Sequence, residues 1–188
     1  FIGGMKGIVI DQFEYGYKSG VAYACKKANK HVDVKVQYAE TFTDAAKGKA
    51  IAIKMFDDCD VVFHAAGGAG VGIIEAAKEK GLYAIGVDMD QSSLAPNNVL
   101  TSAIKDVGKA VEIVSTRFLN GENLGGEKFS FGIKEGCVGI PDDNPNIDSN
   151  TKNDLKQIEQ KIINQEIIPA STPANYEEYL QSLNNSKI

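Results

Sequence analysis

The sequence has 188 residues, of which 43% are hydrophobic and 24% are charged, and its formal net charge is −5. This length suits one domain or two small lobes with a buried core. The negative charge lacks the basic footprint of nucleic-acid-binding proteins, and no apolar run approaches the roughly 20 residues of a membrane-spanning helix. The composition therefore indicates a globular protein and argues against a nucleic-acid partner and a transmembrane segment.

Helix-like and strand-like segments alternate along the first 119 residues. Helices are predicted from apolar side chains at helical spacing and from capping residues, namely Thr43 or Asp44 at the start of the second helix and Gly81 after the third. Strands are predicted from alternating apolar and polar residues or from short β-branched runs. The predicted helices cover residues 9–28, 44–55, 72–80 and 106–119, and the predicted strands cover residues 31–40, 59–66, 82–88 and 98–104. Helix and strand repeated in this order indicate an α/β fold of three layers, α/β/α, with a parallel sheet and right-handed crossovers.

The sequence changes character after Leu119. A turn-rich loop leads to residues 129–140, which are predicted to form two short strands around Gly136. After a polar connector, residues 151–166 are typical of a surface helix with one apolar side, and a last helix is predicted within residues 173–188.

Four glycines interrupt the segment VVFHAAGGAGVGIIEAA, residues 61–77, between a predicted strand and a predicted helix. Their pattern, GGxGxG from Gly67 to Gly72, differs from the GxGxxG of dinucleotide sites and lacks the GK[ST] of a Walker loop. The segment contains no Lys or Arg, so a phosphate would meet only backbone amides and a helix dipole. Two interpretations remain: a turn that lets helix and strand pack closely, or backbone amides that meet a neutral polar ligand.

Three other stretches end at the edge of the sheet where this glycine turn lies. Ligands of open parallel sheets bind at the carboxyl ends of the strands, and there the sequence places Phe42, Asp88 with Asp90, and Lys105. Each also fits a structural role: Phe42 in the core, Asp90 in a turn, and Lys105 at a solvated helix start. Together they predict a pocket for a flat, uncharged ring with hydroxyl groups, in which an aromatic ring stacks and a carboxylate accepts hydrogen bonds.

The sequence offers no catalytic or metal-binding pattern. Its serines lack a neighbouring histidine, and His64 falls within or at the end of a predicted strand, so a nucleophile–base pair is not expected. Three widely spaced cysteines, Cys25, Cys59 and Cys137, form no CxxC pair and are expected to be plain thiols. We therefore predict a binding protein rather than an enzyme, with no cofactor and no metal.

Six stretches carry a resemblance to a known family: FIGGM, FEYGYKSGV, ETFTDAAKGKAIA, VVFHAAGGAGVGIIEAAKEKG, YAIGVDMDQ and VLTSAIKDV. The sequence resembles the basic membrane protein family, the substrate-binding lipoproteins of ABC importers that include the purine nucleoside receptors. The combination of AAGGxGxG, GVDxDQ and TSxxK is specific to that family, and the resemblance covers roughly residues 1–140. It implies a two-lobed type I periplasmic-binding fold that binds its ligand between the lobes. The implied ligand is a nucleoside, with purine nucleosides preferred.

Carried over by motif, the resemblance implies a role for five residues. Phe42 matches the ring that stacks on the base from the second lobe, and Gly67 and Gly68 match the backbone turn. Asp88 matches the carboxylate that binds the ribose, and Lys105 matches the lysine that faces the ribose.

The resemblance also implies a division of the chain at residue 104. Residues 1–104 would form the second, ligand-binding lobe, and residues 105–188 would supply hinge-return segments and C-terminal helices that partly complete the other lobe. The DxGxxxDxSFN-like stretch of the family's first lobe does not occur, so we expect half of the ligand cage to lie outside this sequence. The implied partners are a hydroxylated small molecule and an ABC-transporter permease, and the implied location is the extracytoplasmic face of the cell membrane, through an upstream lipid anchor.

Other functions stay open on the sequence alone. The same fold serves sensory and regulatory modules, although neither a helix-turn-helix nor basic charge indicates DNA binding. A Rossmann-like enzyme is disfavoured by the glycine spacing, and a sugar could replace the nucleoside as the hydroxylated ligand.

Overall fold

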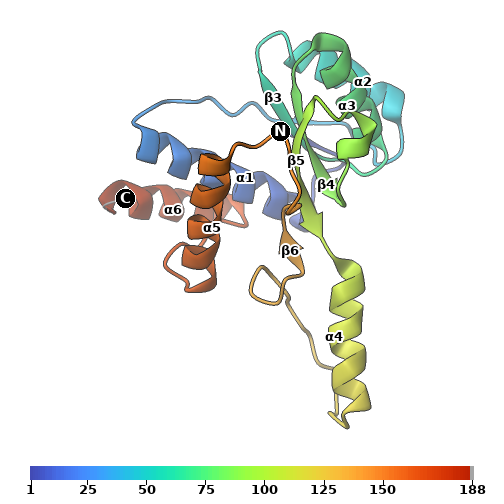
Figure 1. Ribbon diagram of the computed structural model, residues 1–188, viewed down its shortest axis with the longest axis vertical. Helices are drawn as coiled ribbons and strands as arrows, with labels where there is room; N and C mark the ends of the chain where they lie inside the picture. The colour runs from blue at the N-terminus through green and yellow to red at the C-terminus, as the bar shows by residue number, and fades with distance from the viewer. Residues whose placement is uncertain (187–188) are drawn as a thin grey trace.

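The computed structural model describes residues 1–186 as one α/β body with a projecting helix (Figure 1). The strands are β1 (Ile2–Gly3), β2 (Gln37–Tyr38), β3 (Val61–Ala65), β4 (Tyr83–Asp88), β5 (Val99–Lys105) and β6 (Val138–Gly139). The helices are α1 (Ile8–Ala28), α2 (Ala45–Met55), α3 (Ala69–Lys80), the 3-10 helix η1 (Ser92–Leu94), α4 (Val107–Leu119), α5 (Ser149–Ile163) and α6 (Pro173–Asn185).

The strands form a single sheet in the order β2-β1-β3-β4-β5-β6. All neighbouring pairs are parallel except β5 with β6, which is antiparallel. The predicted α/β class with a parallel sheet is therefore confirmed. From β1 the chain continues to β2 on one side, whereas from β3 it continues to β4 on the other side, so the strand order reverses between β1 and β3. In open parallel sheets, ligands bind at such a switch point, outside the carboxyl ends of the strands.

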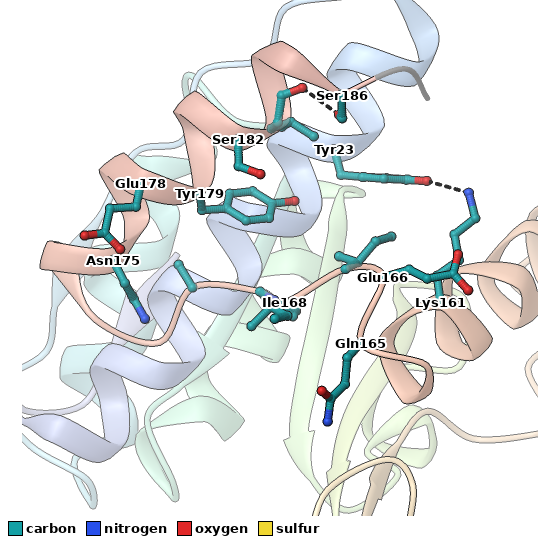
Figure 2. A pocket seen from close by; sticks show the side chains of 14 residues that line it. Tyr23, Lys161, Gln165, Glu166, Ile168, Asn175, Glu178, Tyr179, Ser182 and Ser186 are labelled. Carbon is teal, nitrogen blue, oxygen red and sulfur yellow. Dashed lines mark hydrogen bonds between the residues drawn. The ribbon is translucent and has the colours of Figure 1, made fainter.

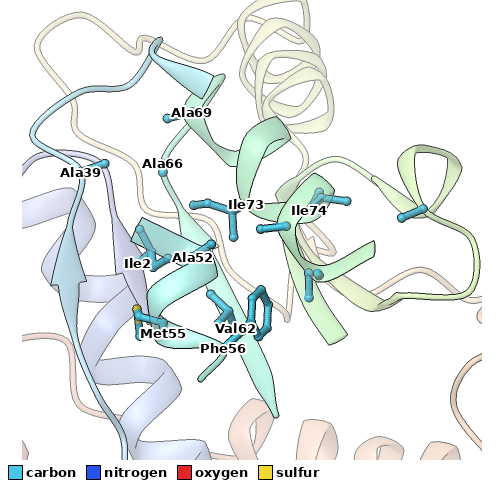
Figure 3. Packing of buried hydrophobic residues seen from close by; sticks show 14 of the residues in the cluster. Ile2, Ala39, Ala52, Met55, Phe56, Val62, Ala66, Ala69, Ile73 and Ile74 are labelled. Atoms are coloured by element: carbon cyan, nitrogen blue, oxygen red, sulfur yellow. The ribbon is translucent and has the colours of Figure 1, made fainter. Parts of the chain in front are cut away.

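Hydrophobic cores cover both faces of the sheet. On one face α2 and α3 pack on the strands through residues such as Phe56, Val62 and Ile73 (Figure 3). On the other face Phe63 and Ile10 belong to a cluster that joins the sheet to α1. Consecutive side chains of β3 thus enter opposite cores, as expected of a strand covered on both faces.

Two of the predicted strand regions, residues 31–40 and residues 129–140, were partly wrong. Of residues 31–40 only Gln37 and Tyr38 form a strand, because their sole neighbour is β1, which is itself two residues long. Of residues 129–140 only β6 is a strand, and it pairs with the end of β5. Phe129 and Phe131 instead stack on each other with their ring centroids 6.0 Å apart. Strand β1 was not predicted, although it lies inside the sheet between β2 and β3.

The predicted helices agree with the structure within a few residues. Asp44 caps α2 by accepting the Lys47 N–H at 2.9 Å, and Gly81 ends α3 in the left-handed conformation with φ of 65°. Helix α3 begins at Ala69, three residues before the predicted start, because the glycine turn itself continues into its first turn.

Helices α2 and α3 approach each other closely at two glycines. A Cβ atom at Gly72 would lie 1.9 Å from the carbonyl oxygen of Ala45, and one at Gly48 would lie 2.3 Å from the carbonyl oxygen of Ala69. Both obstacles are backbone atoms, which cannot move aside as a flexible side chain would. The glycines therefore set the distance between the two helices.

We expect Gly72→Ala to lower the free energy of unfolding by about 1–3 kcal/mol, because the added methyl group forces α2 and α3 apart. Gly20→Ala is the control: Gly20 lies in the interior of α1 with no atom within 4 Å of an added Cβ, so that change should stabilise the protein by about 0.5–1 kcal/mol. Urea unfolding followed by far-UV circular dichroism measures both. Equal midpoints for wild type and Gly72→Ala would contradict the proposed contact.

The C-terminal helices lie on the same body as α1. The Tyr179 hydroxyl donates to the carbonyl of Ser19 at 3.0 Å, and the Lys26 ammonium donates to carbonyls at the end of α6. Lys27 pairs with Asp154 of α5 at 2.8 Å. Helices α5 and α6 therefore cover the outer side of α1.

Helix α4 projects from the end of β5 away from the sheet (Figure 1). Val107, Val111, Phe118 and Leu119 are between 59% and 82% exposed, and none of the helix residues is buried within the described chain. The apolar side of α4 is thus uncovered in residues 1–186.

None of the helices within residues 1–186 combines the length and the apolar character that a membrane span requires.

Candidate functional site

Two glycines follow the neighbouring strands β1 and β3 at their carboxyl ends. Gly4 follows β1, and a Cβ there would lie 2.2 Å from two carbon atoms of the Phe42 ring. Gly67 follows β3 with φ of 54°, and a Cβ there would lie 3.1 Å from the Phe42 carbonyl oxygen. Phe42 therefore lies against both glycines, and only residues without a side chain allow it to approach so closely.

The loop that carries Phe42 is held on both sides. The Phe42 carbonyl accepts the Ala69 N–H at 3.2 Å, which ties the loop to the start of α3. The Thr41 hydroxyl accepts the backbone N–H of Thr43 at 3.1 Å, and Asp44 then caps α2. The ring is half-buried, so one part packs on the sheet and another stays open at the edge.

The amides of the glycine turn are largely used within the turn. The N–H groups of Ala69, Gly70 and Val71 donate to carbonyls of residues 66, 67 and 68 at 3.0–3.2 Å. Gly67 and Gly68 are exposed at the edge of the sheet. A phosphate would have to compete with these internal bonds and would meet no cation in the turn, so the geometry fits an uncharged polar group better.

Asp88 and Lys105 meet at the ends of β4 and β5. The Lys105 Nζ lies 2.8 Å from Oδ1 of Asp88, an ion pair whose angles do not fit a hydrogen bond. Both side chains are nearly half exposed, at 43% and 45%. The same ammonium lies 5.7 Å from the centroid of the Phe13 ring of α1, a cation–π distance. The pair presents one carboxylate and one ammonium at the carboxyl edge.

The backbone at Asp88 is unusual. Its φ is 68°, a left-handed conformation that residues with a Cβ adopt rarely. Asp90, two residues later, is exposed and accepts the Ser92 N–H at 2.9 Å, which makes it the turn residue that the sequence predicts. The two acidic residues of GVDMDQ therefore differ in kind: one is held at the end of a strand and one stabilises a turn.

A buried histidine lies below the glycine turn. His64 of β3 is 0% exposed, and a Cβ at Gly70 would lie 1.9 Å from its ring. Its Nε2 lies 2.9 Å from Oε1 of Gln91. Burial lowers the pKa of the imidazole to about 4, against the opposing effects of the Gln91 hydrogen bond and the Asp88 charge. The sequence predicts a strand end near His64 but gives no sign of the Gln91 contact beyond the place of Gln91 directly after Asp88 and Asp90.

The five predicted site residues thus lie at one edge of the sheet and form two contacts. Phe42 covers the turn of Gly67 and Gly68, and Lys105 pairs with Asp88. Within residues 1–186, no group of His, Cys, Asp and Glu side chains is arranged to hold a metal ion. The side chains gathered at this edge can stack on a ring through Phe42 and form hydrogen bonds through Asp88 and Lys105.

A hollow of about 500 Å³ lies elsewhere, between α1, α6 and residues 165–170 (Figure 2). At its rim the Lys161 ammonium donates to the Tyr23 hydroxyl at 3.4 Å, and the Tyr179 hydroxyl is bound to the Ser19 carbonyl. These groups tie the C-terminal helices to α1. We therefore attribute the hollow to helix packing.

Comparison with known proteins extends these observations. A family model described as "Bmp: ABC transporter substrate-binding protein PnrA-like" matches residues 1–172. Basic membrane protein A2 of Borrelia garinii subsp. bavariensis is 41% identical over 185 residues, which are 96% of this chain and 54% of the relative. Basic membrane protein A of Borreliella burgdorferi is also 41% identical, over 96% of this chain and 53% of the relative. The chain spans about half the length of these relatives.

Solved structures share the fold. An ABC transporter solute-binding protein of Aeropyrum pernix K1 matches with a TM-score of 0.81 and 24% identity, over 97% of this chain and 61% of the other. A transcriptional activator of the comK gene from Bacillus halodurans matches with a TM-score of 0.62 and 24% identity, over 72% of this chain and 48% of the other. At this identity the likeness concerns the fold alone, and it confirms the predicted periplasmic-binding-protein-like architecture.

The family assignment rests on the sequence match, which spans nearly the whole chain and agrees with the motifs at the carboxyl edge. The family is one of transporter binding proteins and not of enzymes. This chain belongs to the Bmp family of PnrA-like ABC transporter substrate-binding proteins.

Proposed function

We propose that the chain forms the ligand-binding lobe of an ABC-importer substrate-binding protein. Its proposed ligand is a nucleoside, with purine nucleosides preferred. The observation that carries this proposal is the arrangement at the switch point. An aromatic ring, Phe42, lies against two glycines, and the Asp88–Lys105 pair stands at the ends of the next strands. A ring face suits a base, and a carboxylate suits the vicinal hydroxyls of a ribose.

The proposal also covers the division of the protein into lobes. Residues 1–104 hold all site residues except Lys105, which ends β5. The exposed apolar side of α4 supports the idea that this helix packs against a second lobe in the full-length protein, since a buried amphipathic helix covers such a side. Helices α5 and α6 lie on α1, so among residues 105–188 we propose α4 and the loop after it as the part that completes the other lobe.

The proposed partners and location follow from the family. A permease would accept the loaded protein, and an upstream lipid anchor would hold it at the extracytoplasmic face of the cell membrane. Isothermal titration calorimetry of the full-length protein against purine nucleosides, pyrimidine nucleosides and free sugars tests the ligand. We expect heat of binding from nucleosides. Binding of sugars alone would overturn the nucleoside assignment.

Phe42→Ala should weaken nucleoside binding by about 1–3 kcal/mol, because base–aromatic stacking contributes that much by alanine substitution. Phe42→Leu is the matched variant, since it keeps an apolar side chain over the glycines but removes the ring face. Both dissociation constants come from calorimetry, with ribose as the second ligand. If Phe42→Ala weakens the nucleoside and the free sugar to the same degree, the ring has only a structural role.

The site should discriminate against phosphate. A nucleoside should bind about 10²-fold more tightly than its 5′-monophosphate, a gap of about 2.7 kcal/mol, because residues 61–77 contain no cation and Lys105 is already paired with Asp88. Titrations of the full-length protein with both ligands at the same salt concentration measure the gap. Comparable dissociation constants would return the glycine turn to the nucleotide interpretation.

A further inference from the structure

We propose that Gln91 is a positioning residue that holds Asp88 in its left-handed conformation and thereby aims the carboxylate at the ligand. This inference rests on the proposed function, because it concerns the same site. The supporting observations are the hydrogen bonds of the Gln91 side chain, the space that receives it, and the turn that it closes.

The Gln91 side chain bridges two strands where their pairing ends. Strands β3 and β4 are in register as far as Phe63 and Ile85, and both continue beyond that pair. Past it, Oε1 of Gln91 accepts the backbone N–H of Val87 at 2.9 Å and lies 2.9 Å from Nε2 of His64. One side-chain oxygen thus joins the end of β3 to the end of β4.

These contacts fix the orientation of both side chains. A backbone N–H can only donate, so the amide atom of Gln91 that faces Val87 must be the oxygen. The same oxygen faces Nε2 of His64, so that nitrogen must carry the proton. Because the imidazole is fully buried and burial favours its uncharged form, the neutral Nε2–H tautomer follows. Its Nδ1 is then a buried acceptor that has no hydrogen-bond partner among the described residues.

The space for this side chain is built into the sheet. A Cβ at Gly86 would lie 2.7 Å from Oε1 of Gln91 and 2.6 Å from the hydroxyl oxygen of Ser102. The same Ser102 oxygen accepts the backbone N–H of Gln91 at 3.1 Å. The backbone and the side chain of Gln91 are therefore both anchored, and its place over β4 depends on a glycine at position 86.

Gln91 acts on Asp88 through Val87. The N–H of Val87 is held by Gln91, and its carbonyl accepts the N–H of Met89 at 2.9 Å, which closes a three-residue turn with Asp88 at the centre. Asp88 has φ of 68°, a conformation that persists only where the surroundings impose it. With Val87 fixed at both backbone groups, the Asp88 side chain is directed to the edge, where Lys105 meets it.

The first test uses the full-length protein without ligand. In 15N NMR spectra, Nε2 of His64 should be protonated and Nδ1 should not be between pH 6 and pH 8. Assigned backbone shifts of Asp88 should report its positive φ in wild type and change in Gln91→Met, which has the same length but no acceptor. Gln12→Met, on the exposed side of α1, should leave those shifts unchanged. An Nδ1–H tautomer, or Asp88 shifts that do not respond to Gln91→Met, would overturn the proposal.

The second test measures guanosine binding by calorimetry. Gln91→Met should bind about tenfold more weakly than wild type, because Val87 is no longer held and the Asp88 carboxylate is then no longer aimed at the ligand. Gln91→Glu, which restores an oxygen acceptor, should bind more tightly than Gln91→Met. In an Asp88→Ala background, Gln91→Met should cause less than a twofold further loss, since its effect passes through Asp88. A full additional tenfold loss would show a merely structural role and overturn the proposal.

The two tests separate the failure of this inference from that of the proposed function. If wild-type protein binds no nucleoside, the proposed function fails, and the NMR measurements still decide whether Gln91 fixes His64 and Asp88. If Gln91→Met fails to fold, the tautomer of His64 in wild-type protein and the guanosine affinity of Gln91→Glu remain measurable. A Gln91→Glu variant that binds as weakly as Asp88→Ala would then count against the proposal.

Discussion

Asp88→Ala is expected to weaken nucleoside binding by about 2–4 kcal/mol, the usual loss when one partner of a hydrogen-bonded charge in an interface is removed. In the proposed complex the carboxylate accepts hydrogen bonds from the ribose hydroxyls, and the Lys105 ammonium lies 2.8 Å from it. The substitution removes the acceptor and also leaves the ammonium without its partner. Calorimetric titration of the full-length protein with a purine nucleoside measures the loss.

Asp90→Ala is the matched control for this experiment. Asp90 carries the same charge two residues away, but its carboxylate is exposed and accepts the Ser92 N–H within a turn. Its removal should change affinity by much less than that of Asp88. Asp88→Asn separates charge from shape, because the amide keeps one acceptor oxygen and loses the charge. Equal affinity of wild type and Asp88→Ala would refute the assignment of Asp88 to the ligand.

Acidification should destabilise the fold through His64. Burial lowers the pKa of this imidazole to about 4 in the folded protein, against 6.5 for an exposed histidine. As the pH falls, the unfolded chain therefore takes up the proton first. The contribution of the neutral His64 to the free energy of unfolding is therefore fully present above pH 6.5. It is lost as the pH falls from 6.5 through the pKa of the folded protein. Between pH 7 and pH 4 the loss amounts to about 3 kcal/mol, because each unit of difference corresponds to about 1.4 kcal/mol.

His64→Gln isolates this contribution from that of the carboxylates. Glutamine can donate to Oε1 of Gln91 but does not titrate, whereas every other acidic and basic group is unchanged. Urea unfolding of both proteins at several pH values from 7 to 4 gives the two stability curves. The wild-type curve should fall more steeply than that of His64→Gln below pH 6.5. Parallel curves over this range would contradict a buried, neutral His64.

Local signals in the sequence predicted most of the helices. Periodic apolar side chains marked α1, α2 and α4, and the caps Asp44 and Gly81 lie at helix ends in the structure. Such signals are reliable because they act between residues close in the chain, as when a carboxylate accepts an N–H three residues later. The carboxyl-edge residues could be predicted for a related reason, since the alternation of strand and helix alone brings strand ends to one edge.

The two short strands β1 and β2 could not be predicted correctly, because a strand forms only where another part of the chain pairs with it. Strand β1 is only Ile2 and Gly3, too short for any period, and it becomes a strand because residues 37–38 and 64–65 flank it. Residues 31–36 alternate like a strand, but among the described residues only the N-terminal ammonium of Phe1, where the described chain begins, bonds to their backbone, at the Lys35 carbonyl. A strand is stabilised by its ladder, so its length is decided by the strand beside it.

The sequence by itself determined the α/β class, the helix ends, and the residue types Phe42, Asp88 and Lys105 at the carboxyl edge. Only the tertiary structure brought Gly4 under the Phe42 ring, paired Lys105 with Asp88 and placed Gln91 between His64 and Val87. Three of these contacts join residues far apart in the chain: Asp88 and Lys105 by 17 positions, His64 and Gln91 by 27, and Gly4 and Phe42 by 38. Periodicity and capping reach only about four residues along the chain, whereas a buried donor takes whichever acceptor the packed fold brings within reach.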